Sequence, residues 1–502
     1  MGWHSRREFL KRSGAGMAAA GALTGRRADA VEQTEKRPNL VFVFPDQMRP
    51  HTMGFMNADP CQTPVLDRFA RESLVLTDAV STRPICSPYR ASLMTGKYPS
   101  ATGVPYNCYS ASAHIGNELR ADDRCISDVL SDAGYSLGYI GKWHLDAPHT
   151  PYVDTANNRK EPAWNEYCPP ERRHGFDFWY AYGTYDNHFA PEYWVNAAPR
   201  GERKRVEEWS PRHETDMAMR YLKNEGGAYR DEDEPFALFV AHNPPHTPYQ
   251  LVPEEYVARY AGQSPEDLLN RPNVPLGSDS GVVRRSKAQI KNYLAMVTGV
   301  DEQFGRLLAT LDELGLAEDT IVVFTSDHGN CIGSHGHWTK GKFWEECYRV
   351  PFLIRWPGRI PARSDRLPLA PADITPTLLG LMGFGSEIPE GVQGANYAGV
   401  FRGENGPRSA SALYMAMPYP ITGDIGWGER GVRTATHTMV IKKMPGEAAE
   451  TWLFENARDP YQLENLAEKE PGLVEKLARE ELLPWLEKAN DPWRDTAWRA
   501  MV

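Results

Sequence analysis

The chain has 502 residues, of which 41% are hydrophobic and 24% charged, a composition typical of an ordinary globular protein with a large core and more than one structural unit. Its formal net charge of -10 argues against general binding to nucleic acids or other polyanions, so an anionic ligand must be held by a local basic site. The seven cysteines lack the C-x-x-C spacing of zinc and redox sites, and their odd number leaves at least one thiol unpaired.

The first thirty residues are typical of a targeting segment. Residues 5–11 read S-R-R-E-F-L-K, which resembles the twin-arginine export signal, and an apolar run too short to span a bilayer follows at 13–24. Residues 28–30 then offer an A-x-A cleavage site. We therefore expect residues 1–30 to be a signal peptide read by the twin-arginine translocase. The mature bacterial protein is expected to be periplasmic or secreted, without a stable membrane anchor.

Four continuous apolar runs predict strands that are buried on both faces of a parallel sheet. These runs lie at residues 39–44, 135–140, 236–241 and 320–325. Helical patterns separate them at 63–70, 126–133, 213–223 and 287–314. Such alternation predicts an α/β fold with helices on both faces of the sheet. Further strands are expected at 77–81 and 351–357, and short antiparallel strands at 431–436, 438–442 and 452–454.

Polar side chains follow each of the four buried runs. They are Asp46 and Gln47, Lys142 and His144, His242 and His246, and Asp327 and His328. Because open α/β sheets bind ligands at the carboxyl ends of their strands, we expect these side chains to converge there, apart from His242, which we interpret as structural. The aromatic-rich segment 148–212 has no clear periodicity and is expected to be a structured insertion near this edge. Its aromatic residues are either a platform for sugar rings or a satellite core.

Cys86 begins the most informative block of the chain. The block contains C-x-P-x-R, which predicts Cys86 at the positive end of a helix and Arg90 one turn further along on the same face. Its continuation, A-S-L-M-T-G-K-Y-P, resembles the signature of the type I sulfatases over its whole length. Similar blocks follow in the family's order, namely G-K-W-H-L at 141–145, P-H at 245–246, S-D-H-G at 326–329 and a lysine block around Lys340. The resemblance extends from residue 39 to about residue 486.

This resemblance implies a role for each matching residue. In the family, the formylglycine-generating enzyme oxidises the cysteine to Cα-formylglycine, whose hydrate attacks a sulfate ester; this role would fall to Cys86. Side chains that surround the sulfate would be Arg90, Lys142, His144, His246 and Lys340. Among them the lysines hold sulfate oxygens, His144 acts as base on the hydrate, and His246 helps to protonate the leaving oxygen. Alignment on the residues that follow favours Lys340 over Lys342 for the sulfate contact.

The resemblance also implies one divalent cation, which in the family is calcium. Its ligands would be Asp46, Gln47, residue 86, Asp327 and His328. Gln47 stands where relatives commonly have a second carboxylate, and many sulfatases carry Asn where His328 stands. A nitrogen ligand suits transition metals better than calcium in general, so the expectation of calcium depends on the family alone.

We therefore predict an alkaline-phosphatase-like α/β fold, with a large mostly parallel sheet flanked by helices and a smaller C-terminal antiparallel sheet. Residues 31–400 would form the catalytic domain and residues 401–502 an α+β subdomain. The expected reaction is hydrolysis of a sulfate monoester on a sulfated carbohydrate or another small sulfate ester. Alternatives from the same superfamily are a phosphonate or phosphate ester hydrolase and a choline-sulfatase-like enzyme. A catalytically silent glycan-binding homologue is the alternative outside enzymes.

Overall fold

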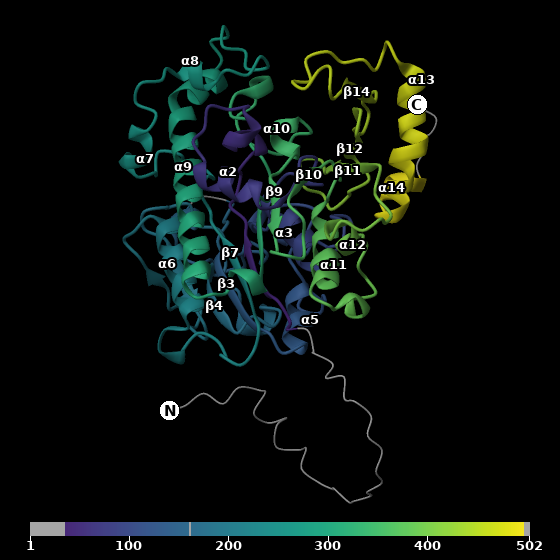
Figure 1. The fold of residues 1–502 in the computed structure, drawn as a ribbon. Helices are drawn as coiled ribbons and strands as arrows, with labels where there is room; N and C mark the ends of the chain where they lie inside the picture. The colour runs from purple at the N-terminus through teal and green to yellow at the C-terminus, as the bar shows by residue number, and fades with distance from the viewer. Residues whose placement is uncertain (1–35, 160–161, 496–502) are drawn as a thin grey trace, which may run out of the picture. The chain divides into compact units, whose positions relative to one another are not determined.

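The computed structural model of this protein describes residues 36–159 and 162–495, so the signal peptide predicted for residues 1–30 lies outside the described residues (Figure 1). Residues from Arg37 onward form one compact unit. Within the described part of the chain, no helix has both the length and the apolar character needed to cross a membrane.

A ten-stranded sheet forms the centre of the unit, in the order β10-β2-β9-β8-β1-β7-β3-β4-β5-β6. Its strands are β1 (Asn39–Val43), β2 (Leu74–Leu76), β3 (Ser136–Lys142), β4 (Phe178–Tyr182), β5 (Glu192–Val195), β6 (Lys204–Arg205), β7 (Phe236–Ala241), β8 (Thr320–Thr325), β9 (Phe352–Arg355) and β10 (Arg363–Asp365). The five central strands, β8-β1-β7-β3-β4, are all parallel. The four buried runs of the sequence supply four of these five strands, which confirms the predicted mostly parallel sheet.

Helices cover both faces of this sheet, because the side chains of its buried strands alternate between two cores. Leu40 and Phe42 of β1 belong to one core, and Val41 and Val43 to the other. The first face packs against α3 (Cys86–Thr95), α5 (Ile126–Asp132), α11 (Pro371–Leu381) and α12 (Ala398–Phe401). The second packs against α2 (Pro64–Arg71), α6 (Ser210–Lys223), α7 (Glu254–Ala258), α8 (Pro265–Leu268) and the long α9 (Gly281–Glu313), which Figure 1 shows beside α6. Short helices α4 (Ser110–Ala113) and α10 (Glu345–Tyr348) lie in loops.

The C-terminal residues form a second sheet, which is antiparallel as predicted. It consists of β11 (Ser411–Ala416), β12 (Gly428–Thr434), β13 (His437–Lys443) and β14 (Glu450–Glu455) in that order. Helices α13 (Pro471–Leu477) and α14 (Leu483–Lys488) pack on it to form a third core. The Met415 N–H donates to the Thr82 carbonyl at 2.8 Å, and the Tyr348 hydroxyl donates to the Leu413 carbonyl at 2.9 Å. These bonds join the second sheet to the segment just before Cys86 and to the segment after Lys340.

Two sequence-based expectations differ from the structure. Residues 77–81 do not form a strand; β2 lies just before them, and only Val80 makes an isolated bridge, to Arg349. Segment 148–212 contributes β4, β5 and β6 to the main sheet, and its large aromatic residues, such as Trp179 and Trp194, are only 1% exposed. Of the two readings of this segment, the structure therefore supports core packing for these side chains.

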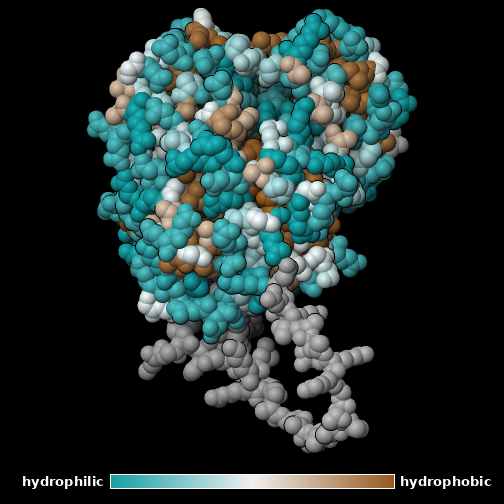
Figure 2. Space-filling model, in the orientation of Figure 1, coloured by the Kyte–Doolittle hydropathy of each residue, from teal (hydrophilic) through white to brown (hydrophobic). Residues whose placement is uncertain are grey.

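The surface carries few large apolar side chains. Figure 2 shows hydrophilic residues over most of the visible face, with hydrophobic residues in small groups. Among the described residues, Tyr419 and Leu463 are the most exposed large hydrophobic side chains, at 57% and 60%. Tyr419 lines a cavity that also contains Lys340.

Candidate active site

The carboxyl ends of neighbouring strands bring acidic and imidazole groups together. Asp46 follows β1, and Asp327 and His328 follow β8, which pairs directly with β1. Cys86 is the first residue of α3 and points to the same place. One ligand atom from each of these four residues lies within 4.8 Å of the others, and all four residues are buried.

This cluster fits a divalent cation. Asp46 Oδ1 and Gln47 Oε1 are buried and have no hydrogen-bond partner among the described residues, although such oxygens normally find one. Gln47 adopts a left-handed backbone conformation (φ 69°), and its Nε2 donates to the Tyr249 hydroxyl at 2.5 Å, which leaves Oε1 as the free atom. His328 donates from Nδ1 to the Gly329 carbonyl at 2.9 Å, so Nε2 remains available as a ligand.

The charges in the cluster also favour a cation. Burial would lower the pKa of His328, but the neighbouring Asp327 and Asp46 carboxylates raise it to about 10. His328 Nε2 lies 3.3 Å from Asp46 Oδ1 and 3.5 Å from Asp327 Oδ1. Two buried carboxylates therefore attract positive charge to one point, the arrangement that a metal ion would satisfy.

Positive side chains surround the Cys86 sulfur. Lys340 Nζ lies 3.0 Å from Sγ, Lys142 Nζ 3.8 Å and His328 Nε2 3.5 Å. Burial and the Asp46 carboxylate would raise the pKa of the thiol, but the Lys142 and Lys340 ammonium groups hold it well below its usual value. A negatively charged atom on residue 86 is therefore stabilised at this position.

Arg90 is tied to the acids of the cluster. Its Nε and Nη2 donate to Asp327 Oδ2 at 3.2 and 3.0 Å, Nη2 lies 3.4 Å from Asp46 Oδ2, and Nη1 donates to the Lys142 carbonyl at 2.5 Å. The guanidinium is 2% exposed or less. Its contacts fix the orientation of the two carboxylates and of the end of β3, so the structure places Arg90 behind the cluster as a positioning residue.

Lys142 and His144 both lie beside Cys86. Lys142 ends β3, and its Nζ donates to Asp46 Oδ2 at 2.6 Å and to Asn243 Oδ1 at 3.1 Å. His144 has a left-handed backbone conformation (φ 55°), and its Nδ1 is buried without a hydrogen-bond partner among the described residues. Its Nε2 donates to the Cys108 carbonyl at 3.1 Å.

His246 follows β7 in the proline-rich loop. Its Nδ1 donates to the Thr247 carbonyl at 2.7 Å and lies 3.5 Å from Asp186 Oδ1. Asp186 also accepts from Asn243 Nδ2 at 3.0 Å. His242 instead pairs with the fully buried Glu214 at 2.7 Å, in agreement with the structural role expected for it.

Sequence reasoning missed Asp186 and Asn243. Asn243 is the second residue after β7, so its place beyond the end of a central strand was the available signal. Asp186 lies in a segment without a motif, and no local signal pointed to it. Asn107 is 9% exposed and accepts the Ser87 N–H at 3.1 Å, so it supports the first turn of α3.

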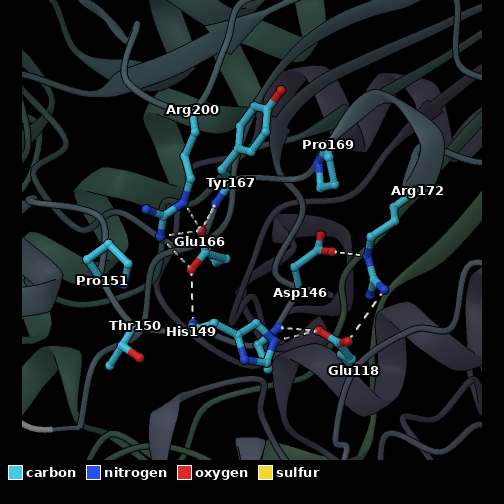
Figure 3. Close-up of a pocket in the computed structure, with 11 residues that line it drawn as sticks. Glu118, Asp146, His149, Thr150, Pro151, Glu166, Tyr167, Pro169, Arg172 and Arg200 are labelled. Atoms are coloured by element: carbon cyan, nitrogen blue, oxygen red, sulfur yellow. Dashed lines mark hydrogen bonds and ion pairs between the residues drawn. The ribbon is translucent and has the colours of Figure 1, made fainter.

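Two cavities are lined by residues that are close in sequence to residues of the site. One, of about 380 Å³, is lined by Ile85 and Lys340 and therefore borders residue 86. The other, of about 400 Å³, is shown in Figure 3 and includes Asp146, two residues beyond His144. In that second cavity the charged groups pair with one another: Arg172 with Asp146 at 2.7 Å, and Arg200 with Glu166 at 3.0 Å.

Comparison with known proteins agrees with this geometry. The model of the sulfatase family matches residues 38–384, and that of the N-sulphoglucosamine sulphohydrolase C-terminal region matches residues 333–484. An endo-4-O-sulfatase of Bacteroides thetaiotaomicron is 41% identical over 497 residues, covering 92% of this chain and 94% of that protein.

Two solved structures are similarly close. The structure of the sulfatase yidJ from Bacteroides fragilis has a TM-score of 0.86 at 43% identity and covers 92% of this chain and 99% of its own. A second, described with the metabolism of multiple glycosaminoglycans by Bacteroides thetaiotaomicron, has a TM-score of 0.85 at 40% identity and covers 91% and 98%. The chain therefore belongs to the sulfatase family of the alkaline phosphatase superfamily and is a sulfuric ester hydrolase.

Proposed function

We propose that the protein hydrolyses sulfate monoesters on carbohydrates, after residue 86 has been converted from Cys to Cα-formylglycine by the formylglycine-generating enzyme. The observation that carries this proposal is the position of the Cys86 sulfur, 3.0 Å from Lys340 Nζ and beside the cation-binding cluster. The relatives support a carbohydrate substrate, since one is an endo-4-O-sulfatase and another is described with glycosaminoglycan metabolism.

The surrounding side chains can carry the steps of this reaction. As a formylglycine hydrate, residue 86 supplies one hydroxyl that attacks sulfur and a second whose deprotonation restores the aldehyde and releases sulfate. Lys142 and Lys340 place ammonium groups where they offset the charge of the sulfate in the transition state. Because His144 donates from Nε2 to a carbonyl, its Nδ1 is the atom that can accept a proton from residue 86.

His246 is suited to the departing oxygen. Its Nδ1–H is held by the Thr247 carbonyl, so Nε2 is the ring atom that can carry the proton given to the sugar. The Asp186 carboxylate lies 3.5 Å from Nδ1, on the side of the ring away from the atom that would give up this proton. The two histidines thus have separate tasks, one at the nucleophile and one at the leaving group.

The oxygen ligands Asp46, Gln47 and Asp327, with His328, would hold the cation, and we propose calcium. A bound divalent cation supplies positive charge that favours ionisation of the hydroxyl on residue 86. The three oxygen donors suit calcium, whereas the imidazole would also suit a transition metal. Metal analysis of the purified protein distinguishes these ions.

The rival functions differ in what they require of the pocket. A choline-sulfatase-like enzyme needs acidic and aromatic groups around a cation, but the cavity beside residue 86 contains Arg83, Lys340, Lys342 and Lys442 against a single acid, Glu429. A silent glycan-binding protein has no use for a buried nucleophile precursor between two lysines. A phosphonate or phosphate ester hydrolase shares the site, and matched aryl sulfate and phosphonate esters would separate it by their kcat/KM values.

We further propose export by the twin-arginine translocase to the periplasm or beyond. The motif at residues 5–11 supports this route, which carries folded proteins and so allows residue 86 to be oxidised before export. Fusion of residues 1–30 to a reporter, with Arg6 and Arg7 replaced by Lys, tests it. Export that persists without the arginine pair would contradict the proposal.

Mass spectrometry of the peptide that contains residue 86 tests the central proposal. Produced with the formylglycine-generating enzyme, this peptide should lose about 18 Da, the difference between CH₂SH and CHO, and the protein should release sulfate from sulfated oligosaccharides. The Cys86→Ala variant is the matched control and should release none. An unmodified thiol in a protein that still releases sulfate would overturn the role of residue 86.

A further inference from the structure

The cavity of about 380 Å³ beside residue 86 is built by two separate parts of the chain. One wall comes from Arg83 and Ile85, just before α3, and from the Lys340–Lys342 segment. The opposite wall comes from the C-terminal sheet, including Tyr419 between β11 and β12 and Lys442 of β13. A substrate whose sulfate contacts Lys340 would therefore extend along this cavity toward the C-terminal sheet.

Arg83 in this cavity is a buried cation without a counter-ion. The residue is 2% exposed, its Nε is buried without a hydrogen-bond partner, and its guanidinium makes no ion pair with any residue in 36–159 or 162–495. Nearly every other buried arginine near the site is paired, as Arg90 is with Asp327. Burying an unpaired charge is costly, so this position favours a negatively charged ligand.

Lys342 adds a second cation on the same wall. It is partly exposed and makes no ion pair among the described residues, whereas Lys442 across the cavity already pairs with Glu450 at 2.6 Å. The single acid of the cavity, Glu429, accepts a hydrogen bond from the Tyr414 hydroxyl at 2.8 Å. The cavity of Figure 3 lacks this excess of positive charge, because its arginines are matched by carboxylates.

We propose that Arg83 and Lys342 form a second anion subsite, which binds a carboxylate or a further sulfate of the substrate close to the ester that is cleaved. This inference depends on the proposed sulfatase function and narrows the substrate to acidic glycans. A guanidinium binds carboxylate or sulfate oxygens through two parallel hydrogen bonds, which fixes the neighbouring sugar as well as attracting it. The exposed ring of Tyr419 offers an aromatic face for that sugar.

Selectivity between two probes tests the subsite. The first probe is a 4-O-sulfated glycosaminoglycan tetrasaccharide with its uronate carboxylates, the second the same tetrasaccharide with those carboxylates reduced to alcohols. The wild type should prefer the first in kcat/KM, and Arg83→Gln should reduce that preference about 10-fold, mainly through KM. Arg83→Lys should restore part of it because the charge returns.

Lys342→Ala provides a second variant at a partly exposed position, where loss of folding is not expected, and it should also reduce the preference. Lys442→Ala is the matched control, because this lysine lines the same cavity but is already paired, and it should reduce the preference less than Lys342→Ala does. Melting temperatures of all variants show whether they fold. If the wild type, Arg83→Gln and Lys342→Ala all showed the same preference for the acidic tetrasaccharide, the subsite would be overturned.

A binding measurement separates this proposal from the proposed function. Calorimetry with protein produced without the formylglycine-generating enzyme, which retains Cys86, reports affinity for the acidic tetrasaccharide without turnover. Tighter binding of the acidic probe that depends on Arg83 supports the subsite even if no sulfate is released. Sulfate release without any dependence on Arg83 or Lys342 would leave the sulfatase function standing and remove the subsite.

Discussion

At the scale of single residues, Asp186 and His246 form the acid–imidazole pair that we assign to the leaving group. Asp186 lies 3.5 Å from His246 Nδ1 and is held by Asn243. Burial would raise the pKa of Asp186, but the positive charge of His246 and the hydrogen bond between the two side chains lower it. The carboxylate is therefore ionised at working pH and places a negative charge beside the His246 ring.

Replacing Asp186 by Asn should lower kcat for a sugar sulfate by about 10-fold to 100-fold, because proton transfer to a sugar oxygen needs a charged donor. For an aryl sulfate, whose leaving group departs without a proton, the loss should be smaller. Steady-state kinetics with both substrates gives the two ratios. Equal losses for both would show that Asp186 shapes the pocket without assisting protonation.

The residues of this site divide by how far the sequence could predict them. Cys86, Lys142, Asp327 and Lys340 stand in motifs, and the structure brings them together as expected. The left-handed backbone of His144 and the unpaired charge of Arg83 could not be predicted, because both depend on contacts between segments that are distant in sequence. Motifs identify residue types, whereas charge balance requires the assembled fold.

At the scale of elements, long buried strands were predictable and short ones were not. β1, β3, β7 and β8 are mostly apolar with every residue buried, and their apolar character is visible without tertiary information. The three-residue β2 and two-residue β6 are too short for any periodicity to show, and they are defined by their partners. The short outer strands of this sheet can therefore be assigned only from their pairing with neighbouring strands in the folded protein.

Helix α2 depends on an acid from another helix. Asp301, in the middle of α9, accepts the backbone N–H groups of Val65 and Leu66 at 3.1 and 2.7 Å and so caps the start of α2. Burial raises the pKa of Asp301 to about 7, although these two hydrogen bonds act to lower it. The folded state therefore binds the proton more tightly than the unfolded chain does.

The sign of the resulting pH dependence follows from this raised pKa. The stabilisation linked to Asp301 is complete below pH 4 and is lost as the pH rises through about 7, by up to about 4 kcal/mol. Melting temperatures of the wild type should therefore fall relative to Asp301→Asn between pH 5 and pH 8. The exposed Asp312→Asn on the same helix should run parallel to the wild type. A difference that stays constant with pH would contradict the raised pKa.

Arg433 joins the two sheets through buried charges. From β12 it donates to Glu345 Oε1 of α10 at 2.8 Å and lies 3.3 Å from Asp78 Oδ1, and its side chain is 4% exposed. Arg433→Ala would leave Glu345 with Arg349 and Asp78 with Arg366 as remaining partners, and breaking this buried network should destabilise the fold by about 3 kcal/mol. Arg479→Ala, which breaks an exposed pair with Glu475, should cost less than about 1 kcal/mol. Thermal unfolding of both variants measures the two losses, and equal losses would show that the buried contacts of Arg433 do not stabilise the fold.

At the scale of the whole molecule, the architecture follows from the order of strands and helices, and the predicted sulfatase fold is confirmed. The sequence indicated a second, antiparallel sheet but not that its loops would form one wall of the cavity beside residue 86. That arrangement depends on contacts such as Met415 with Thr82, which no local pattern reveals. The C-terminal sheet thus lines a cavity beside a site whose reactive groups all come from the preceding part of the chain, between Asp46 and Lys340.

The cation cluster links stability to metal content, because it joins segments that follow β1, β8 and the start of α3. Without a cation, the carboxylates of Asp46 and Asp327 repel each other in a buried site, so a bound ion should stabilise the fold as well as the reaction. At 100 times its dissociation constant a single ion contributes about 2.7 kcal/mol. Chelation should therefore lower both the melting temperature and the rate of sulfate release, and added calcium should restore both.

Two variants test whether the effect of chelation on the melting temperature arises at this cluster. Asp327→Ala removes one ligand, so chelation should no longer shift its melting temperature, while its Arg90 partner loses its main contact. His328→Asn exchanges the nitrogen ligand for an oxygen, which should favour calcium over zinc in a competition followed by melting temperature. If the wild type melted at the same temperature with chelator, calcium or zinc, the cluster would be held by Lys142, Lys340 and Arg90 alone, and the metal site would have to be abandoned.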